Sequence, residues 1–351
     1  RIENPIRGNH CPSAPHVSLR LTKEHMGAMF DLKIKLQEET MRHLAAGWIG
    51  IVVAVTSGTA AAQVIERISV STGGVEANGD SFAPLYDGVS ADGRFVVFES
   101  EATNLVPGDG NGLRDVFVRD RALGITTLVS KSTSGGVASG ESRYPSISED
   151  GLWIAFSSDA SDLVAGDTNS AQDVFVFERT SGQITRVSMA WDGSESNGDS
   201  RTPSISGDGR YVAFRSGATN LISGSMDASK YIYVRDLQTE VTELASVPSV
   251  GGAEVGGSWY PHMTPAGRPV AFISHSTNLV GFDANAANDL FLLDLEPGQS
   301  LLFGVQVSGD DGNGHSGGFG ICSDGLYVGF FSNATDLLPP GEDFNAVQDA
   351  F

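Results

Sequence analysis

Short stretches in which apolar and polar residues alternate recur along most of the chain. Val116 and Val118 share one side of such a stretch, and Phe175 and Phe177 share one side of another. Alternation with a period of two places one set of side chains on a single face of a β-strand. After residue 63 no stretch keeps a helical period for three turns. The pattern therefore predicts an all-β protein built from short strands.

These strands are organised by an internal repeat. Each repeat contains a segment of the type Ile-Ser-x-Asp-Gly-Arg-Tyr-Val-Ala-Phe, as at 205–214. Self-similarity at a fixed period is the signature of a repeat architecture, so each repeat is expected to form one structural unit. The five segments end at Phe98, Phe156, Phe214, Phe272 and Phe330, which are 58 residues apart throughout.

Each repeat holds four strand candidates. The first is of the Pro145–Ser148 type, and an adjacent Asp-Gly pair then turns the chain into the second, such as Tyr211–Arg215. A polar loop leads to the third, such as Asp115–Asp120, and a short turn leads to the fourth, such as Thr185–Ser188. Four antiparallel strands per repeat predict a β-propeller of four-stranded blades. A β-sandwich is the alternative, but it does not explain a period of 58 residues.

The two ends of the repeat region complement each other. Ile65–Val70 matches a fourth strand, whereas Asp349–Phe351 matches the beginning of a third strand. The N-terminal strand is therefore expected to close the last of five blades, which would cover the sheet edges. The alternative is a further blade beyond Phe351, so that both five and six blades fit the sequence.

Residues 41–62 have the three parts of a secretory signal peptide. A basic start precedes an apolar run from Leu44 to Val55, and small residues stand at Ala60 and Ala62. A transmembrane anchor is the alternative, but the run is well short of the roughly 20 apolar residues that span a bilayer. The segment is therefore interpreted as a signal peptide that is removed on export.

This signal peptide divides the chain into three parts. Residues 1–40 begin with Arg and are interpreted as a non-native upstream extension, with Met41 as the true start. Cleavage of the signal leaves residues 63–351 as the propeller, beginning at Gln63. The mature protein is expected in the periplasm of a bacterium or outside the cell, without a membrane span.

Composition and charge limit the partners. Apolar residues make up 40% of the chain, which is enough to build a core, and Cys322 is the one cysteine after the signal peptide. The net charge is −21, and residues 63–351 hold 15 basic against 38 acidic residues, which argues against a nucleic-acid partner. The loops that join strands four to one and two to three carry 23 of these acids and two basic residues. An acidic loop face suited to cations or a basic partner is therefore expected.

The Pro-x-Ile-Ser-x-Asp-Gly units, each followed by a segment such as Asp-Val-Phe-Val, resemble the WD40-like (PD40) repeats of the TolB-like β-propeller family. The resemblance covers residues 64–351 and implies an exported propeller that works as a binding scaffold. TolB itself has an additional α/β domain and six blades, whereas five repeats are visible here. The resemblance therefore implies an architecture more than a role in the Tol envelope machinery.

The most regular polar feature is an Asp-x-Asn-x-x-x-Asp pattern in the loop between the second and third strands. Such oxygen-bearing side chains suit a hard cation such as Ca²⁺, which takes about six to eight oxygen ligands. The alternative is that Asp and Asn bind nearby backbone amides and fold the loop without an ion. Blade three breaks the pattern, with Ser225, Asp227 and Tyr231 at these places. The candidate metal ligands are Asp109, Asn111, Asp115, Asp167, Asn169, Asp173, Asp283, Asn285, Asp289, Asp343, Asn345 and Asp349.

Two other features of the sequence are weaker candidates for a catalytic or metal site. Gly314–Gly318 fits the G-x-S-x-G expression of serine hydrolases, but Ser316 occupies the place where a first strand begins in every repeat. His262, His275 and His315 show no metal-ligand spacing. Of the three, His262 is expected to face the central channel.

No catalytic constellation stands out, so the sequence predicts a non-enzymatic binding or scaffold module with a protein or glycan ligand. We expect a monomer without an assured cofactor, Ca²⁺ being the candidate. The alternative is a glycan-acting hydrolase or lyase with its site at the channel mouth, where paired carboxylates are the usual machinery. Non-repeating His, Tyr, Arg and carboxylate groups gathered at one mouth would favour the enzyme, whereas a repeated ring of Asp and Asn would favour binding.

Overall fold

The computed structural model describes residues 51–53, 65–84, 86–224, 227, 229–249, 256–267, 269–281, 283, 285, 287–294, 299–303, 312–322, 327–339 and 347–351. The chain divides into two compact units, Arg1–Gly47 and Trp48–Phe351, and every described residue belongs to the second. These ranges contain strands, turns and bends but no helix, and hence no helical candidate for a membrane span. The predicted all-β class is confirmed there. Of the predicted signal peptide, residues 51–53 are described, and the predicted extension 1–40 lies outside the described residues.

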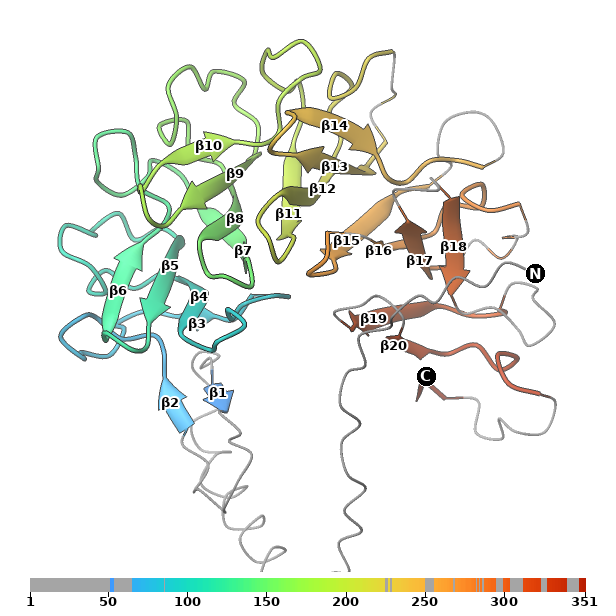
Figure 1. Cartoon of the computed structure of the whole chain (residues 1–351), viewed down its shortest axis with the longest axis horizontal. Coiled ribbons are helices and arrows are strands. Elements are labelled where there is room, and N and C mark those ends of the chain that lie inside the picture. The colour runs from blue at the N-terminus through green and yellow to red at the C-terminus, as the bar shows by residue number, and fades with distance from the viewer. Residues whose placement is uncertain are drawn as a thin grey trace, which may run out of the picture. The chain divides into compact units, whose positions relative to one another are not determined.

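Five antiparallel sheets follow one another along the chain, one for each repeat, and we call them blades 1 to 5 (Figure 1). Blade 1 contains β3 (Ser81–Phe82), β4 (Phe95–Ser100), β5 (Asp115–Asp120) and β6 (Ile125–Leu128). Blade 2 contains β7 (Ser142–Ile147), β8 (Trp153–Ser158), β9 (Asp173–Glu178) and β10 (Ile184–Arg186). Blade 3 contains β11 (Ser200–Ile205), β12 (Tyr211–Ser216), β13 (Tyr231–Asp236) and β14 (Val241–Leu244). Blade 4 contains β15 (Ser258–Met263), β16 (Val270–Ser274), β17 (Asp289–Asp294) and β18 (Gln299–Phe303), and blade 5 contains β19 (Ser316–Ile321), β20 (Val328–Ser332) and β21 (Asp349–Ala350).

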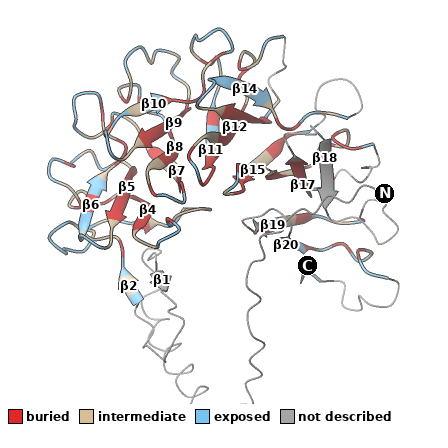
Figure 2. Cartoon of the chain, viewed as in Figure 1, coloured by how far each residue is buried: buried red, intermediate tan, exposed pale blue. Residues whose placement is uncertain are grey.

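Each blade is built around two aromatic or apolar central strands. The Phe that ends the repeated segment lies opposite an aromatic residue of the third strand, and the two rings stack with centroids 5.6 to 6.0 Å apart. Burial in blades 1 to 4 is concentrated on these central strands (Figure 2). The pairs are Phe98 with Phe117, Phe156 with Phe175, Phe214 with Tyr233, and Phe272 with Phe291.

The first strands of blades 2 to 5 are longer than the sequence predicts, whereas β3 of blade 1 has two residues. The Pro145–Ser148 type of strand was expected to start at the proline, but β7 starts three residues earlier, at Ser142. Its pairing with β8 shifts register between Arg143 and Ser146, which forms a bulge around the proline. A bulge releases the residue from the ladder, so a proline without an N–H is tolerated there.

Neighbouring blades are also joined by aromatic rings that rest on the glycines of the Asp-Gly turns. Gly209, with φ of 72°, lies so close to Trp153 of blade 2 that an added Cβ would be 2.1 Å from Cδ1 of the ring. Phe95 covers Gly151 in the same way, and Tyr211 covers Gly267, which follows Ala266 in the corresponding turn of blade 4. These contacts form the seams between blades 1 to 4.

A line of backbone hydrogen bonds runs from blade to blade along these turns, and we call it the relay. The N–H of Ala91 donates to the carbonyl of Glu149 (2.8 Å), Glu149 donates to Gly207 (3.0 Å), and Gly207 donates to Pro265 (2.8 Å). The four residues hold the same place in successive repeats. Pro265 has no N–H, so the relay cannot continue into blade 5.

The predicted closure by the N-terminal strand is not confirmed. β2 (Ile65–Arg67) pairs antiparallel with β1 (Ile51–Val53), and blade 5 has three strands within the described ranges. The residue after β2, Ile68, is 3% exposed and belongs to the core cluster of blade 1. Arg121 of blade 1 binds Glu66 (Nε–Oε2 2.8 Å). The N-terminal segment is therefore anchored on blade 1, where Ile68 finds apolar cover.

Candidate functional site

The Asn of the predicted metal motif folds its own loop in three blades. In blade 1, the Asn111 amide donates to the carbonyl of Ala138 (3.2 Å) and its side-chain oxygen accepts the N–H of Leu113 (2.9 Å). The loop is thereby joined to the connection that leads into the next blade. The same bonds run from Asn169 to Ser196 and Ala171, and from Asn285 to Gly312 and Ala287.

The last Asp of the motif is buried against donors of its own blade. Asp115 is fully buried and accepts the hydroxyl of Ser130 (2.7 Å) and the amide of Asn111 (3.2 Å). Burial is the main cause that raises the pKa of Asp115 to about 6, and the negative charges of Asp109 and Asp162 add to it. Hydroxyl and amide donors therefore hold this carboxyl group in place.

Blade 2 places an arginine among the acids of the motif. The Arg186 guanidinium lies 2.7 Å from Glu195, 3.3 Å from Asp173 and 3.5 Å from Asp167. Hydrogen bonds from Thr168 and Arg186 lower the pKa of Glu195 to about 2. A cation that belongs to the protein thus occupies the centre of the motif in this blade.

The surroundings of the motif positions differ in blades 3, 4 and 5. In blade 3, which lacks it, the Tyr231 hydroxyl donates to Asp227 (2.8 Å). In blade 4, Asp283 and Asp289 are both buried. In blade 5, Asp349 begins β21, and the candidate ligands Asp343 and Asn345 lie outside the described residues.

Within the described ranges, no three His, Cys, Asp or Glu side chains gather in a way that could hold a metal ion. Asn111 and Asn169 accept backbone N–H groups of their own loops, as the ion-free alternative expects. Asp115 and Asp173 accept hydrogen bonds from side chains. Calcium binding at these loops stays a prediction.

A second cluster joins the segment between β3 and β4 of blade 1 to the first strands of blades 4 and 5. His262 is 8% exposed, and its Nε2 lies 3.1 Å from Oδ2 of Asp87. Its ring stacks on Tyr86 with centroids 4.5 Å apart and lies 6.1 Å from the ring of Phe319. His262 thus faces other blades across the centre, as expected. A His, a Tyr and a carboxylate gather there, which are three of the four group types that would favour an enzyme.

Tyr86 and Asp87 were not predicted from the sequence as site residues. Tyr86 stands 58 residues before Tyr144, so the repeat itself carried the signal for an aromatic position at the centre. Burial is the main cause that raises the pKa of Tyr86 to about 12, with smaller contributions from Tyr260 and Asp87. The phenol therefore stays protonated over the physiological pH range.

Around this cluster the backbone is strained. Tyr144, Thr202 and Tyr260 have φ of 57°, 49° and 52°, at the bulges that precede the strand prolines. Non-glycine residues with such φ cost about 1–3 kcal/mol each and gather at functional sites or structural clamps. With Tyr86, they surround a cavity of only about 10 Å³. The side chains around this cavity leave space in it for no more than a water molecule.

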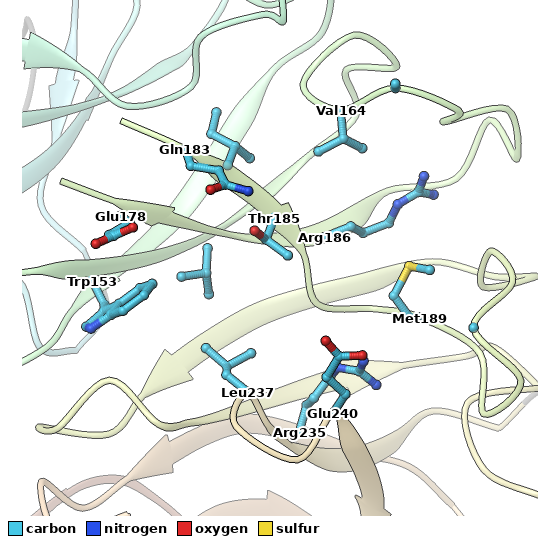
Figure 3. A pocket seen from close by; sticks show the side chains of 14 residues that line it. Trp153, Val164, Glu178, Gln183, Thr185, Arg186, Met189, Arg235, Leu237 and Glu240 are labelled. Atoms are coloured by element: carbon cyan, nitrogen blue, oxygen red, sulfur yellow. The ribbon is translucent and has the colours of Figure 1, made fainter. Parts of the chain in front are cut away.

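A much larger groove, of about 650 Å³, lies between blades 2 and 3 (Figure 3). One side is formed by Gln183, Thr185 and Arg186 around the outer strand of blade 2, and the other by Leu237 and Glu240 at the end of β13 and in the turn before β14. The other lining residues are Trp153, Val164, Ala165, Val176, Glu178, Ile184, Met189, Gly193 and Arg235.

The groove combines apolar surface with a buried cation. Arg235 is 9% exposed, and its Nη1 donates to the hydroxyl of Thr242 (3.0 Å). Burial lowers the pKa of Arg235, and the charge of Glu240 acts in the opposite direction. β10, which lines the groove, is the edge strand of its sheet. A ligand in this groove would meet apolar side chains, a guanidinium and a sheet edge.

No family model matches the chain, and no curated protein matches it. Among solved structures, TolB from Acinetobacter baumannii is 14% identical over 79% of this chain and 55% of that chain, with a TM-score of 0.41. A putative TolB from Agrobacterium tumefaciens is 18% identical over 88% of both chains (TM-score 0.42). Oligogalacturonate lyase from Vibrio parahaemolyticus is 13% identical over 82% of this chain and 68% of that chain (TM-score 0.47). The chain spans about half the length of the Acinetobacter TolB, and in its repeated four-stranded sheets it is similar to TolB-like β-propellers.

Proposed function

We propose that the protein is an exported binding module that takes an extended polypeptide segment in the groove between blades 2 and 3. The observation that carries this proposal is the edge strand β10 beside a cavity of about 650 Å³. Ligand pockets commonly measure about 300–1,000 Å³. Sheet edges recognise extended peptides through main-chain hydrogen bonds, and adjacent pockets select side chains.

The hydrogen-bond pattern supports an available edge. Val187, just after β10, donates its N–H inward to the carbonyl of Val174 (2.8 Å). Because inward and outward N–H groups alternate along a strand, those of Ile184 and Arg186 point away from β9. In blade 1 the corresponding N–H of Thr126 points outward and donates to the Thr72 hydroxyl (3.1 Å). In blade 2, a backbone carbonyl of a ligand strand would accept the N–H of Ile184, as the Thr72 hydroxyl accepts that of Thr126 in blade 1.

The alternative of a glycan-acting enzyme at the channel mouth is favoured by one observation, the His262–Asp87 pair. Against it, the cavity that Tyr86, Tyr144, Thr202 and neighbouring prolines enclose beside this pair measures only about 10 Å³. A sugar ring does not fit in that volume. We therefore propose that the ligand binds in the groove and that the central cluster holds blades 1, 4 and 5 together.

The test is a parallel selection on the purified protein with a phage-displayed random-peptide library and a glycan array. We expect peptides to be recovered, and Ile184→Pro to abolish their binding, because it removes an outward N–H and leaves the inward bonds of β10 in place. Leu128→Pro is the matched control, since it removes an outward N–H from the edge strand of blade 1. Recovery of glycans alone, or peptide binding that survives Ile184→Pro, would contradict the proposal.

Export is tested at the N-terminus. When the chain is expressed from Met41 in a bacterium, the protein recovered from the periplasm or medium is expected to begin at Gln63. A protein that stays in the cytoplasm with residues 41–62 attached would contradict the proposed signal peptide.

Calcium binding is tested by thermal unfolding. If the loops with Asp109, Asp115 and Asp283 bind Ca²⁺, a millimolar excess over chelator raises the unfolding midpoint, because an ion that binds the folded state stabilises it. An identical midpoint in calcium and in chelator would exclude the acidic loops as metal sites.

A further inference from the structure

Three basic side chains gather in a chain whose net charge is −21. Arg201 of β11, Arg215 of β12 and Lys230, just before β13, surround what we call the basic cavity. Arg201 forms an ion pair with Asp199 (Nη2–Oδ2 2.9 Å), whereas Arg215 and Lys230 form none within the part of the chain that the structure describes. The basic cavity measures about 200 Å³ and is lined by Asp199, Arg201, Arg215, Ser216, Gly217 and Lys230.

The two arginines of the basic cavity repel each other. Arg201 and Arg215 are directly opposite in the register of β11 and β12. Like charges at such positions destabilise a sheet, and the charge of Arg201 adds to burial in lowering the pKa of Arg215. In blade 2 the residue opposite Arg143 is Ser157, which carries no charge. Blade 3 therefore keeps a repulsion that a serine would remove.

Blade 1 shows how the same place looks when its charges are balanced. There Arg114 lies between two carboxylates, 3.3 Å from Glu99 and 2.8 Å from Glu101. Two repeats later, Lys230 stands in the place of Arg114, Arg215 in the place of Glu99, and Gly217 in the place of Glu101. Blade 3 has therefore lost both carboxylates and gained a second cation.

We propose that the basic cavity binds a ligand with two carboxylate groups, which take the places that Glu99 and Glu101 fill in blade 1. With Asp199 included, the cavity carries a formal charge of +2, which a dianion neutralises. Gly217, in the place of Glu101, has no side chain that could fill the cavity. The buried Nε of Arg215 has no hydrogen-bond partner among the described residues, and a guanidinium binds carboxylates through paired N–H donors.

The test is calorimetric titration of the full chain with glutarate, with inorganic phosphate, and with sodium chloride at matched ionic strength. We expect glutarate to bind with one site per chain, and Arg215→Ser to weaken it at least about tenfold, as the loss of a charge-assisted hydrogen bond does. Arg215→Lys keeps the charge but loses the paired N–H donors, so its affinity for glutarate is expected to lie between those of the unchanged chain and Arg215→Ser. Arg67→Gln removes an exposed cation elsewhere and serves as the matched control.

A second readout separates binding from a structural role. Without ligand, Arg215→Ser is expected to leave the unfolding midpoint nearly unchanged, because the repulsion from Arg201 and the contact of the guanidinium with the Trp259 ring (5.5 Å) are lost together. An arginine kept for structure would give a lower midpoint. The proposal is overturned if Arg215→Ser binds glutarate as tightly as the unchanged chain, if Arg67→Gln weakens binding equally, or if phosphate binds and glutarate does not. None of these outcomes depends on the groove between blades 2 and 3.

Discussion

The ends of the central strands are fixed by a recurring pair of charged residues. In blade 3, Arg210 donates to both carboxylate oxygens of Asp236, with Nη2–Oδ2 at 2.7 Å and Nε–Oδ1 at 3.1 Å. Asp236 also accepts the N–H groups of Gln238 and Thr239. Hydrogen bonds from Arg210 are the main cause that lowers the pKa of Asp236 to about 2. Arg94 and Asp120 form the same pair in blade 1.

This pair makes part of the stability depend on pH. The pKa of Asp236 is lower in the folded state than in the unfolded chain, so its contribution is present above about pH 4 and disappears as the pH falls through about 2. We expect Asp236→Asn to cost about 1–2 kcal/mol at pH 7, discounted for the exposure of Arg210. Urea denaturation from pH 7 to pH 2 checks this, and the difference should vanish at the acid end. Glu243→Gln, at an exposed position of β14, should change stability little at any pH.

Strain at single residues gives a second prediction. Thr202 has φ of 49°, and its hydroxyl is buried without a hydrogen-bond partner among the described residues. Gly318 holds the same place in blade 5 with φ of 56°. Thr202→Gly is therefore expected to stabilise the protein by about 1 kcal/mol, because relief of strain and of the unpaired hydroxyl exceeds the entropy lost with glycine.

Thr127→Gly is the control for this strain, because Thr127 is an exposed residue of β6 with an ordinary φ. There glycine is expected to cost about 0.5–1 kcal/mol. Chemical denaturation measures both variants. If Thr202→Gly is destabilising to the same extent as Thr127→Gly, the positive φ carries no strain.

Among the elements, the turns and central strands could be predicted from the sequence, and the seams could not. Asp115–Asp120 was predicted as a third strand and is β5. The Asp-Gly pairs were predicted as turns, and Gly151 and Gly209 have φ of 69° and 72°. That rings of the preceding blade cover these glycines is a contact between repeats, and a pattern within one repeat does not reveal it.

The seam between blades 2 and 3 supplies a prediction for these elements. Gly209→Ala would place a Cβ 2.1 Å from the Trp153 ring at a φ of 72°, so we expect a loss of about 2–4 kcal/mol. Gly108 has φ of 82° with no atom within 4 Å of an added Cβ, so Gly108→Ala should cost about 1 kcal/mol. The difference between the two unfolding free energies measures the packing of the seam. Equal losses would mean that Trp153 moves aside without cost.

The candidate sites show the same limit of prediction. The same Asp-x-Asn-x-x-x-Asp pattern fits a loop that binds a cation and a loop whose carboxylates accept hydrogen bonds within the protein. Only the positions of Arg186 beside Asp173 and of Ser130 beside Asp115 distinguish the two, and the pattern does not contain them. His262 and Asp87 are 175 residues apart and meet because blades 1 and 4 face the same centre. The basic cavity was not predicted, because Arg215 and Gly217 lie within a repeat whose other positions closely resemble those of its neighbours.

At the scale of the whole molecule, blade 5 exposes an aromatic position that is covered by the next blade in blades 1 to 3. Tyr327 of blade 5 holds the place of Phe95, Trp153 and Tyr211, yet it is 76% exposed. The receiving glycine in blade 1, Gly93, would meet only Arg121 if it carried a Cβ. Among the described residues, no ring rests on this glycine as rings do on Gly151 and Gly209.

The number of blades can be tested at this surface. Tyr327→Ser is expected to change the free energy of unfolding by less than about 0.5 kcal/mol, as exposed substitutions do. Tyr211→Ser, at the covered equivalent, should cost about 2–4 kcal/mol. Both values come from the same denaturation experiment. A large cost at Tyr327 would show that another blade, or the closing strand, packs on it in solution.

The end of the relay at Pro265 has a consequence for the order of events when the protein opens. Blades 1 to 4 share backbone bonds across every seam, so none of them opens without disturbing the next. Blade 5 lies beyond the last bond of the relay, although the N–H of Ser316 still joins it to the carbonyl of Asn288 in blade 4 (2.6 Å). The seam between blades 4 and 5 thus lacks one of the two kinds of backbone bond that the other seams have, and repeat proteins separate where coupling between neighbours is weakest. Amide protons of β20 should therefore exchange with solvent sooner than those of β8, and a protease that cuts only opened chain should release the C-terminal repeat first. Because Pro265 has no N–H, blade 5 is expected to separate from blades 1 to 4 before these blades unfold.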